Sequence, residues 1–386
     1  MNKKKITTFA IMALIIVSLI LGYNLYEKNR AYAVATENNY PNIQTELIDC
    51  VKYINKALEA VTTKAYTEMA KKVPNAWRHI YKGADSGPIS RISTASNKVM
   101  AIKLKKLLEE KNPDLVICTH PFASQMCSYL KRKEKTNVKI ATILTDFAIH
   151  NQWVVGHEYT DYFFVSHLGM KEDLITEGVN PNKIYTTGIP LSNKFLLEYD
   201  KSQILENFGL TPGKKTVLFF GGGELGLGKT HTFNIFKSFV QNDNIQLVAI
   251  AGKNPKMREH FESYVEEMGK ENSVKVLEYT DKVAQLMSIS DLVVTKPGGL
   301  TTTESLASGL PIVVINPIPG QEEENAEFLE KSQVAIWIKK DDNVEEILND
   351  LFSNPDKMQK MKVQARLMAK KNSTRDICEI LFNNNI

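Results

Sequence analysis

A strand, a glycine turn and a helix follow one another in the segment DLVVTKPGGLTTTESLAS, residues 291–308. The apolar run Asp291 to Thr295 predicts a buried strand, the Pro-Gly-Gly after it predicts a sharp turn, and Thr301 to Ser308 predicts a helix. Free backbone N–H groups and the dipole at the start of such a helix favour an anion. The segment therefore predicts a binding site for a phosphate or a diphosphate.

Four residues of this segment are candidate ligand contacts. Gly298 and Gly299 let a diphosphate approach the helix start without a Cβ in the way. Thr301 opens the predicted helix, and Glu304 lies one turn further on, where its carboxylate can accept hydrogen bonds from ribose hydroxyls. The alternative is an ordinary strand–turn–helix connection with a solvated glutamate.

A second glycine-rich loop, GGGELGLGKT, follows the predicted strand 216–220 and opens another helix. Backbone N–H groups of Gly221, Gly222 and Gly223 can line a phosphate or a sugar. Read from Gly223, the loop also fits the GxxxxGK(S/T) pattern of a P-loop, so a phosphotransferase is an alternative. We rank it lower because no convincing Walker-B carboxylate follows a later apolar strand, and Asp291 precedes its strand instead of ending it.

Polar residues follow two further predicted strands of the same half. Strand 246–250 is followed by Gly252, Lys253 and Asn254, and strand 312–315 by Gln321, Glu322 and Asn325. Because the carboxyl ends of parallel strands meet at one edge of a sheet, these residues are expected to wall the same pocket as Glu304. Amide and carboxylate groups suit the hydroxyls of a hexose. A solvated turn is the alternative for Lys253 and Asn254.

A candidate acid–base pair lies in the first half, in the segment TDFAIHNQW, residues 145–153. Asp146 follows the predicted strand 139–144, and His150 comes four residues later. A carboxylate and an imidazole beside a ligand can move a proton. A structural role for the histidine is the alternative.

Strand and helix patterns alternate along nearly the whole chain, which predicts parallel sheets covered on both faces. The predicted strands of the first half are residues 12–21, 115–118, 139–144, 162–165 and 184–186. Those of the second half are residues 216–220, 246–250, 274–278, 292–295, 312–315 and 335–338, before a helical tail over 344–381. The pattern indicates an α/β fold with two Rossmann-like domains facing a cleft, and ligands at the carboxyl ends of the strands.

The chain has 386 residues, enough for two domains, and a formal net charge of +4 that is unevenly distributed. Residues 51–133 hold about 16 Lys and Arg against about 6 Asp and Glu. Within this basic segment, cationic and aromatic groups mix in a way that suits an anionic bilayer, with solvated surface as the alternative. The residues concerned are Lys71, Lys72, Trp77, Arg78 and Tyr81. We expect no nucleic-acid partner, because no recognised binding motif accompanies the charge.

The four cysteines, Cys50, Cys118, Cys127 and Cys378, have no CxxC or metal-like spacing. Scattered cysteines of this kind favour reduced thiols in a cytosolic compartment. No metal site is expected.

The N-terminus joins three lysines, residues 3–5, to an apolar run from Ile6 to Leu21. The run is short for a membrane-spanning helix, and no convincing cleavage site follows it. Two interpretations stay open. One is an uncleaved membrane anchor, which would put the rest of the chain outside the cytosol. The other, favoured by the alternating pattern, is a buried first strand over 12–21 that feeds a turn and a helix.

Taken together, PGGLTTTESLASGLPIVV, GQEEEN, GGGELGLGK and TDFAIHNQW resemble segments of the diacylglycerol glycosyltransferases. That family comprises bacterial processive glucosyltransferases and plant monogalactosyldiacylglycerol synthases, and it is related to the peptidoglycan enzyme that adds N-acetylglucosamine to lipid I. The resemblance covers about residues 40–380. It implies the GT-B fold, with an acceptor- and membrane-facing domain (26–195), a linker (196–213) and a UDP-sugar-binding domain with a closing helical tail (214–386). The apolar segment before them (1–25), a first strand or a membrane anchor, departs from the family pattern.

The same resemblance implies a hexosyltransferase that needs no cofactor. Such an enzyme moves a hexose from a UDP-sugar to diacylglycerol or a related lipid with inversion. It would act at the cytoplasmic face of the cell membrane, bound peripherally or anchored by the N-terminal segment. By this likeness Glu304 would bind the donor ribose, Gln321 and Glu322 the hexose, and Gly298 and Gly299 the diphosphate, with Gly221 to Gly223 on the donor side.

One departure from the family pattern concerns the glycine-rich loop after the first strand, which usually ends in histidine as GxGH. The corresponding residues here, Gly22 to Leu25, read GYNL. Deprotonation of the acceptor hydroxyl would then fall to Asp146 or His150. The alternative is a catalytically impaired protein that binds a UDP-sugar at the membrane.

Overall fold

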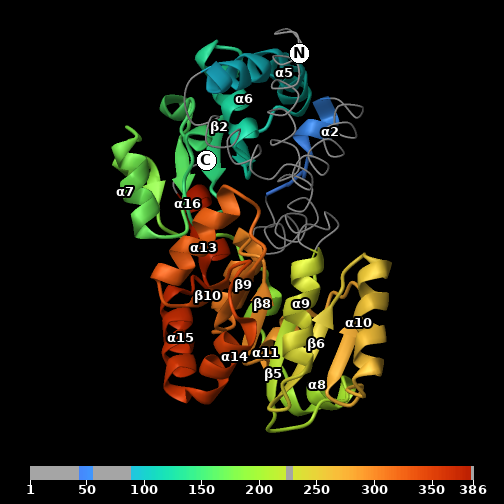
Figure 1. Ribbon diagram of the computed structural model, residues 1–386. Coiled ribbons are helices and arrows are strands. Elements are labelled where there is room, and N and C mark those ends of the chain that lie inside the picture. The colour runs from blue at the N-terminus through green and yellow to red at the C-terminus, as the bar shows by residue number, and fades with distance from the viewer. Residues whose placement is uncertain (1–42, 55–87, 223–228, 384–386) are drawn as a thin grey trace. The chain divides into compact units, whose positions relative to one another are not determined.

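The computed structural model describes residues 43–54, 88–222 and 229–383, which form two compact units (Figure 1). The first unit runs to Ser192 and also takes in Pro319–Gln321 and the chain from Asn372 onward. The second unit comprises Asn193–Ile318 and Glu322–Lys371. The predicted strand over 12–21, the loop at Gly22 to Leu25 and the five membrane candidates Lys71, Lys72, Trp77, Arg78 and Tyr81 lie outside the described residues.

The first unit contains a four-stranded parallel sheet in the order β1-β2-β3-β4. Its strands are β1 (Leu115–Cys118), β2 (Lys139–Ile143), β3 (Tyr162–Phe164) and β4 (Ile184–Tyr185). Its described helices are α2 (Cys50–Ile54), α5 (Pro88–Lys111), α6 (Pro121–Arg132), α7 (Leu168–Thr176) and α16 (Ser373–Asn383), with short 3₁₀ turns η1 (Asn151–Trp153), η2 (His157–Tyr159) and η3 (Pro181–Lys183).

Alternate residues of these strands serve opposite faces of the sheet, as the period of two requires. Ile140 of β2 joins the core with α5 and α6. Phe163 of β3 packs with α7. Phe164, the next residue, packs with Ile143 and with Ile377 of α16. The first-unit sheet is therefore covered on both faces, which is the usual condition of an all-parallel sheet.

The second unit contains a six-stranded parallel sheet in the order β10-β9-β8-β5-β6-β7. Its strands are β5 (Lys215–Phe220), β6 (Ile245–Ile250), β7 (Val274–Leu277), β8 (Leu292–Thr295), β9 (Ile312–Ile315) and β10 (Ala335–Ile338). Its helices are α8 (Lys201–Asn207), α9 (Lys229–Val240), α10 (Pro255–Glu267), α11 (Val283–Ile289), α12 (Gly299–Ala307), α13 (Gln321–Lys331), α14 (Val344–Ser353) and α15 (Pro355–Met368), preceded by the 3₁₀ turn η4 (Asn193–Leu196). Gln321 itself, the first residue of α13, groups with the first unit.

The second-unit sheet is also the centre of three layers. Val217 and Phe219 of β5 join a core with α9, α10 and α14, in which Phe219 meets the rings of Phe236 and Phe261 edge-on. Leu218, between them, packs on the opposite face with α11. The strand order is that of a classical dinucleotide-binding sheet, so the expected Rossmann-like architecture is confirmed for this unit.

Every strand expected from residue 115 onward is present, within one or two residues of its predicted bounds. The helix expected over 301–308 begins at Gly299, so the glycine turn is shorter than predicted. The expected helical tail is three helices, because Asn354-Pro355 starts α15 afresh and the chain leaves helix again after Met368.

The last helix, α16, groups with the first unit, whereas its sequence position suggested the C-terminal domain. Ile377 and Leu381 are buried against β2 and β3. Ser373 Oγ donates to the Ile189 carbonyl at 2.7 Å, and the Thr374 hydroxyl exchanges hydrogen bonds with Leu191 at 2.8 and 3.0 Å. Apolar burial and these bonds hold α16 to the first-unit sheet.

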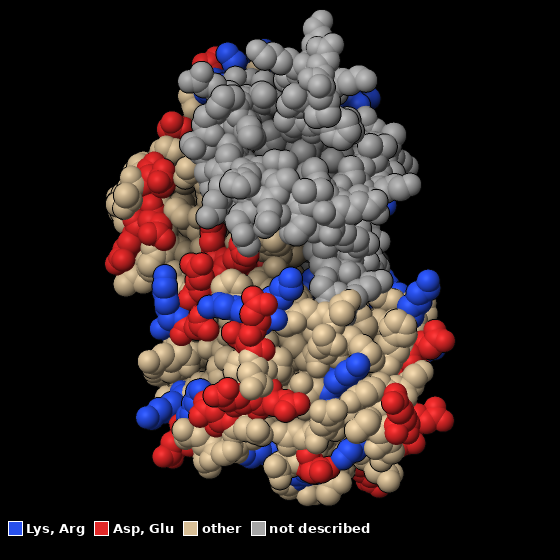
Figure 2. All heavy atoms as spheres, in the orientation of Figure 1, with Lys and Arg blue, Asp and Glu red and all other residues tan. Residues whose placement is uncertain are grey.

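Lys, Arg, Asp and Glu side chains are interspersed on the visible face of the second unit (Figure 2). On α5, which belongs to the described part of the basic segment, Lys105 and Lys106 form ion pairs of 2.5 and 3.6 Å with Glu109 and Glu110. Within the described ranges, no helix has the length and hydrophobicity needed to cross a bilayer.

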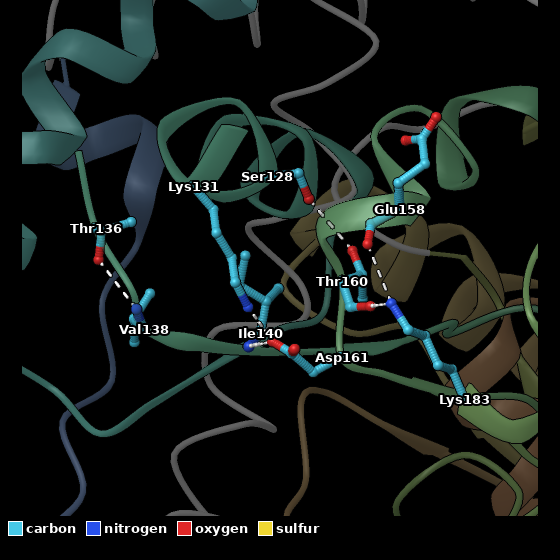
Figure 3. Close-up of polar contacts among 9 residues, drawn as sticks. All are labelled: Ser128, Lys131, Thr136, Val138, Ile140, Glu158, Thr160, Asp161 and Lys183. Carbon is cyan, nitrogen blue, oxygen red and sulfur yellow. Dashed lines mark hydrogen bonds and ion pairs between the residues drawn. The ribbon is translucent and has the colours of Figure 1, made fainter. Parts of the chain in front are cut away.

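A polar network fixes α6 to the chain that follows β2 (Figure 3). Lys131 of α6 forms an ion pair of 2.5 Å with Asp161, whose carboxylate also accepts the Ile140 N–H at 2.8 Å. The hydroxyls of Ser128 and Thr160 lie 3.2 Å apart, and the Lys183 ammonium donates to the Thr160 carbonyl at 2.7 Å. The network holds the end of the segment 151–161 against α6.

We predict that Gly156→Ala destabilises the protein more than Gly213→Ala does. Both glycines have left-handed backbones, with φ of +81° and +80°, so both substitutions incur backbone strain of about 1–3 kcal/mol. A Cβ on Gly156 would lie 2.8 Å from the Ser128 Cβ, whereas one on Gly213 meets nothing within 4 Å. The clash should add about 1–3 kcal/mol. Urea unfolding followed by circular dichroism measures the difference, and equal losses would contradict the packing described here.

Candidate functional site

The second-unit sheet has one place where the chain leaves neighbouring strands in opposite directions. From β5 the chain proceeds towards β6, and from β8 it proceeds towards β9, although β5 and β8 are paired. Such a switch point leaves a crevice at the carboxyl ends of the strands, where ligands of open α/β sheets bind. Gly221 directly follows β5 and Lys296 directly follows β8. Both glycine-containing loops predicted from the sequence therefore lie at this point.

Helix α12 begins at the switch point with no side-chain cap. Gly298 occupies the N-cap position in an extended conformation and makes no side-chain cap hydrogen bond. The hydroxyls of Thr303 and Ser305 are instead bonded to carbonyls one turn back, at 2.8 Å each. Thr301 thus lies in the first turn of a helix whose leading N–H groups are not used by a cap, which is what an anion site needs.

Glu304 is 7 % exposed and belongs to the buried side of α12. Asn325 of α13 is fully buried, and its side-chain amide donates to the Pro297 carbonyl at 3.0 Å. Asn325 therefore fixes the Pro-Gly-Gly turn.

Glu322 lies against the same turn. Its Oε1 is 3.7 Å from the position that a Cβ on Gly298 would take, and its Oε2 accepts the Ile318 N–H at 2.6 Å. Burial raises the pKa of Glu322, against the opposing influences of Lys296 and of the Ile318 N–H. Burial likewise lowers the pKa of Lys296, against the attraction of Glu322. A basic and an acidic side chain, each half-buried, thus lie beside the start of α12.

Lys296 was not among the residues that the sequence singled out. Its position directly after a buried strand, inside the Thr-Lys-Pro-Gly-Gly turn, was the available signal. An ammonium group there can neutralise a diphosphate together with the helix dipole.

Gly221 and Gly222, which follow β5, are glycines for different structural reasons. A Cβ on Gly221 would lie 2.6 Å from the Phe261 ring, so close packing requires glycine at this position. Gly222 has φ of +115° and open space where a Cβ would lie. Gly252, after β6, has φ of +64° and approaches the Gly222 carbonyl, which brings the two loops together. Gly223 lies outside the described residues.

Asn254 and Lys253 both have contacts within the second unit. Asn254 caps α10 by accepting the Met257 N–H at 3.2 Å. The Lys253 ammonium lies 5.5 Å from the ring centroid of the exposed Tyr279. The structure thus gives Asn254 a capping role and places Lys253 over an aromatic ring.

In the first unit, Asp146 and His150 follow β2 and are 4 % and 9 % exposed. Burial lowers the pKa of His150 to about 4, so its ring is neutral at neutral pH. The amide of Gln321, which groups with this unit, donates a hydrogen bond to the Asp146 carboxylate. Gln321, which the sequence predicts to contact the hexose, therefore contacts Asp146, which the sequence predicts to accept a proton.

His167, after β3, fixes the loop that carries Asp146. Its Nδ1 accepts the Met170 N–H at 3.3 Å, so the proton of the neutral ring lies on Nε2. That Nε2 lies 2.9 Å from the Phe147 carbonyl and donates to it. The Asp146 loop is held by a histidine that the sequence did not single out.

The two halves of the chain match different protein families. Residues 29–191 match the family described as monogalactosyldiacylglycerol (MGDG) synthase, and residues 200–368 match glycosyl transferases group 1. The chain is 30 % identical over 325 residues to the processive diacylglycerol beta-glucosyltransferase of Bacillus subtilis. The matched region covers 84 % of this chain and 83 % of that protein. It is 32 % identical over 282 residues to the protein of that name from Staphylococcus epidermidis, covering 73 % and 70 %.

Solved structures agree on the fold. The S. aureus MnaA–UDP co-structure superposes with a TM-score of 0.57 at 18 % identity, covering 78 % of this chain and 83 % of that one. Acinetobacter baumannii MurG superposes with a TM-score of 0.54 at 14 % identity, covering 75 % and 79 %. The predicted architecture of two parallel-sheet α/β domains of the GT-B kind is confirmed.

We predict that Lys296 and Glu322 are energetically coupled. Lys296→Met leaves the Glu322 carboxylate desolvated without its counter-charge, and Glu322→Gln does the same to the ammonium, so each single change destabilises the protein. The double variant should lose less than the sum, with a coupling of about 0.5–3 kcal/mol. Urea unfolding of the ligand-free proteins gives the cycle. Strictly additive losses would show that the two charges do not interact.

Proposed function

Because the chain belongs to the diacylglycerol glycosyltransferase family, we propose that it transfers glucose from a UDP-sugar to diacylglycerol. Hexosyl transfer to a lipid is the activity of the family, and glucose is the sugar in the name of its relatives. The local observation that carries the proposal is the uncapped start of α12 beside Lys296 at the switch point of the second-unit sheet.

The donor would bind to the second unit. The diphosphate lies against the leading N–H groups of α12, where Gly298 and Gly299 leave room and Lys296 supplies a positive charge. Glu304 accepts from the ribose, while Gln321 and Glu322 contact the hexose. When the bond to the sugar breaks, the charge on the leaving UDP develops against the same dipole and ammonium.

The reaction would be a single displacement. The relatives' name specifies a β-glucoside, and UDP-glucose carries its sugar in the α configuration, so the anomeric centre inverts. The acceptor hydroxyl attacks the anomeric carbon, the bond from that carbon to the diphosphate breaks, and a base takes the hydroxyl proton. We assign the base to Asp146, because its carboxylate accepts a hydrogen bond from Gln321, the predicted hexose contact, and so lies beside a residue that would hold the sugar.

The lipid acceptor and the membrane surface belong to the same proposal. The protein would act as a peripheral enzyme at the cytoplasmic face of the cell membrane, where the basic segment that includes Lys71, Lys72 and Arg78 meets anionic lipid. The aromatic residues Trp77 and Tyr81 suit the headgroup region.

A second candidate function follows from the sequence GYNL at Gly22 to Leu25, where the family usually has a loop histidine. A chain without that group would bind a UDP-sugar at the membrane with little or no turnover. The P-loop alternative is not favoured, because the relatives are glycosyltransferases.

Incubation of the purified protein with diacylglycerol vesicles and UDP-glucose, followed by mass spectrometry of the lipids, tests the proposal. We expect glucosyl-diacylglycerol, and UDP-galactose in a parallel reaction reports the choice of hexose. UDP binding measured by calorimetry in the same preparations distinguishes the two candidates. Binding of UDP-glucose without transfer of any hexose would replace the enzyme by the impaired binding protein.

We predict that Asp146→Asn lowers kcat by about 10²- to 10⁴-fold, the usual contribution of a general base, with little change in UDP affinity. His150→Gln should cost far less. Because His150 is protonated only below a pH of about 4, its titration adds no inflection to kcat between about pH 5.5 and 8. An inflection near pH 6.5 that disappears in His150→Gln would transfer the role of base to His150.

A further inference from the structure

Two buried N–H groups stand at the carboxyl edge of the first-unit sheet. His120 follows β1 by two residues and is the N-cap residue of α6. Trp153 ends η1, on the chain that follows β2. The side chains are 7 % and 2 % exposed. Neither His120 Nε2 nor Trp153 Nε1 has a hydrogen-bond partner within the described part of the chain.

The hydrogen bonds around His120 fix which nitrogen carries its proton. Nδ1 accepts the Phe122 N–H at 3.3 Å, so the proton of the neutral ring lies on Nε2. Burial, and then the nearby His150, lower the pKa of His120 to about 3, which keeps the ring neutral at neutral pH. His120 Nε2 and Trp153 Nε1 are therefore both donors. Buried donors without a partner are rare, and such a group in a native structure calls for an explanation.

Neighbouring elements hold both groups near Asp146. Strands β1 and β2 are paired with Cys118 opposite Thr142, so the residues that follow them emerge side by side. The Ser124 hydroxyl lies 2.7 Å from that of Thr142, which ties the first turn of α6 to β2. The rings of Trp153 and His150 have centroids 5.9 Å apart, and His150 is near enough to His120 to help lower its pKa.

We propose that His120 Nε2–H and Trp153 Nε1–H bind an uncharged oxygen of the lipid acceptor and hold its glycerol beside Asp146. The inference rests on the proposed function and adds two acceptor-binding residues to it. Neutral N–H donors suit a hydroxyl or ester oxygen, whereas a phosphate calls for guanidinium or ammonium groups. The acceptor that this chemistry favours is a glycerolipid with an uncharged headgroup.

His120→Asn separates the two roles of His120. The Asn Oδ1 can still accept the Phe122 N–H, as a good N-cap does, but the residue is too short to replace Nε2–H. We expect kcat/KM for dioctanoylglycerol to fall about tenfold, the effect of one hydrogen bond between neutral groups. The KM for UDP-glucose, the affinity for UDP and the melting temperature should stay near those of the unaltered protein.

Trp153→Phe is the second variant, because it keeps an aromatic ring and removes only the N–H. His260→Asn, on the exposed side of α10, is the matched control for the histidine change and should leave both substrates unaffected. Acceptor kinetics within twofold of the unaltered protein in both His120→Asn and Trp153→Phe would overturn the inference and leave internal water as the partner of these donors. An equal loss for donor and acceptor would also overturn it.

Turnover by the unaltered protein separates this inference from the proposed function. Without transfer to dioctanoylglycerol by that protein, the proposed function itself fails. With transfer, and with unchanged variants, only the assignment of His120 and Trp153 fails.

Discussion

The order of the strands in the second unit is the constraint on which the candidate site depends. Because β5 continues towards β6 and β8 towards β9, the loops that follow two paired central strands diverge and leave their carboxyl ends uncovered. The Pro-Gly-Gly turn then presents the start of α12 at that place, and Asn325 fixes the turn through the Pro297 carbonyl. The charges of Lys296 and Glu322 lie beside it. Sheet topology, one buried amide and two half-buried side chains of opposite charge type thus surround the candidate anion site.

The first unit uses buried polar groups in another way. His120, His150 and His167 all follow strands or begin helices, and burial lowers the pKa of each of them. Neutral rings orient neighbouring groups through one nitrogen and offer the other as a donor or an acceptor. His167 uses one nitrogen to cap α7 and the other to hold the Asp146 loop, whereas His120 uses one nitrogen to cap α6. That difference separates a structural histidine from one that is available to a ligand.

Much of the fold was predictable because parallel strands leave a strong local signal. Runs such as residues 292–295 and 312–315 are apolar on both faces and end at turn residues, so their existence and bounds followed from pattern alone. The membership of α16 was not predictable, because its packing on β2 and β3 joins residues far apart in the sequence.

The site was predictable where backbone geometry determines the residue type. The glycine turn at Gly298 and the strand-end position of Asp146 are examples. Lys296 and His120 were not predicted as candidate site residues, since a lysine in a turn and a histidine before a proline have many ordinary explanations. Lys296 is distinguished by its desolvation, and His120 by its buried N–H group without a partner in the described part of the chain. Both properties arise only in the tertiary structure. Gly221 and Asn254 show the converse, because their pattern suggested ligand contact and the structure also gives them packing and capping roles.

A co-crystal structure of the protein with UDP is the most direct test of the central claim. We predict the diphosphate within hydrogen-bond distance of the leading N–H groups of α12, with the Lys296 ammonium beside it and the ribose hydroxyls on Glu304. Uridine bound elsewhere on the second unit, with the start of α12 unchanged by the nucleotide, would contradict it.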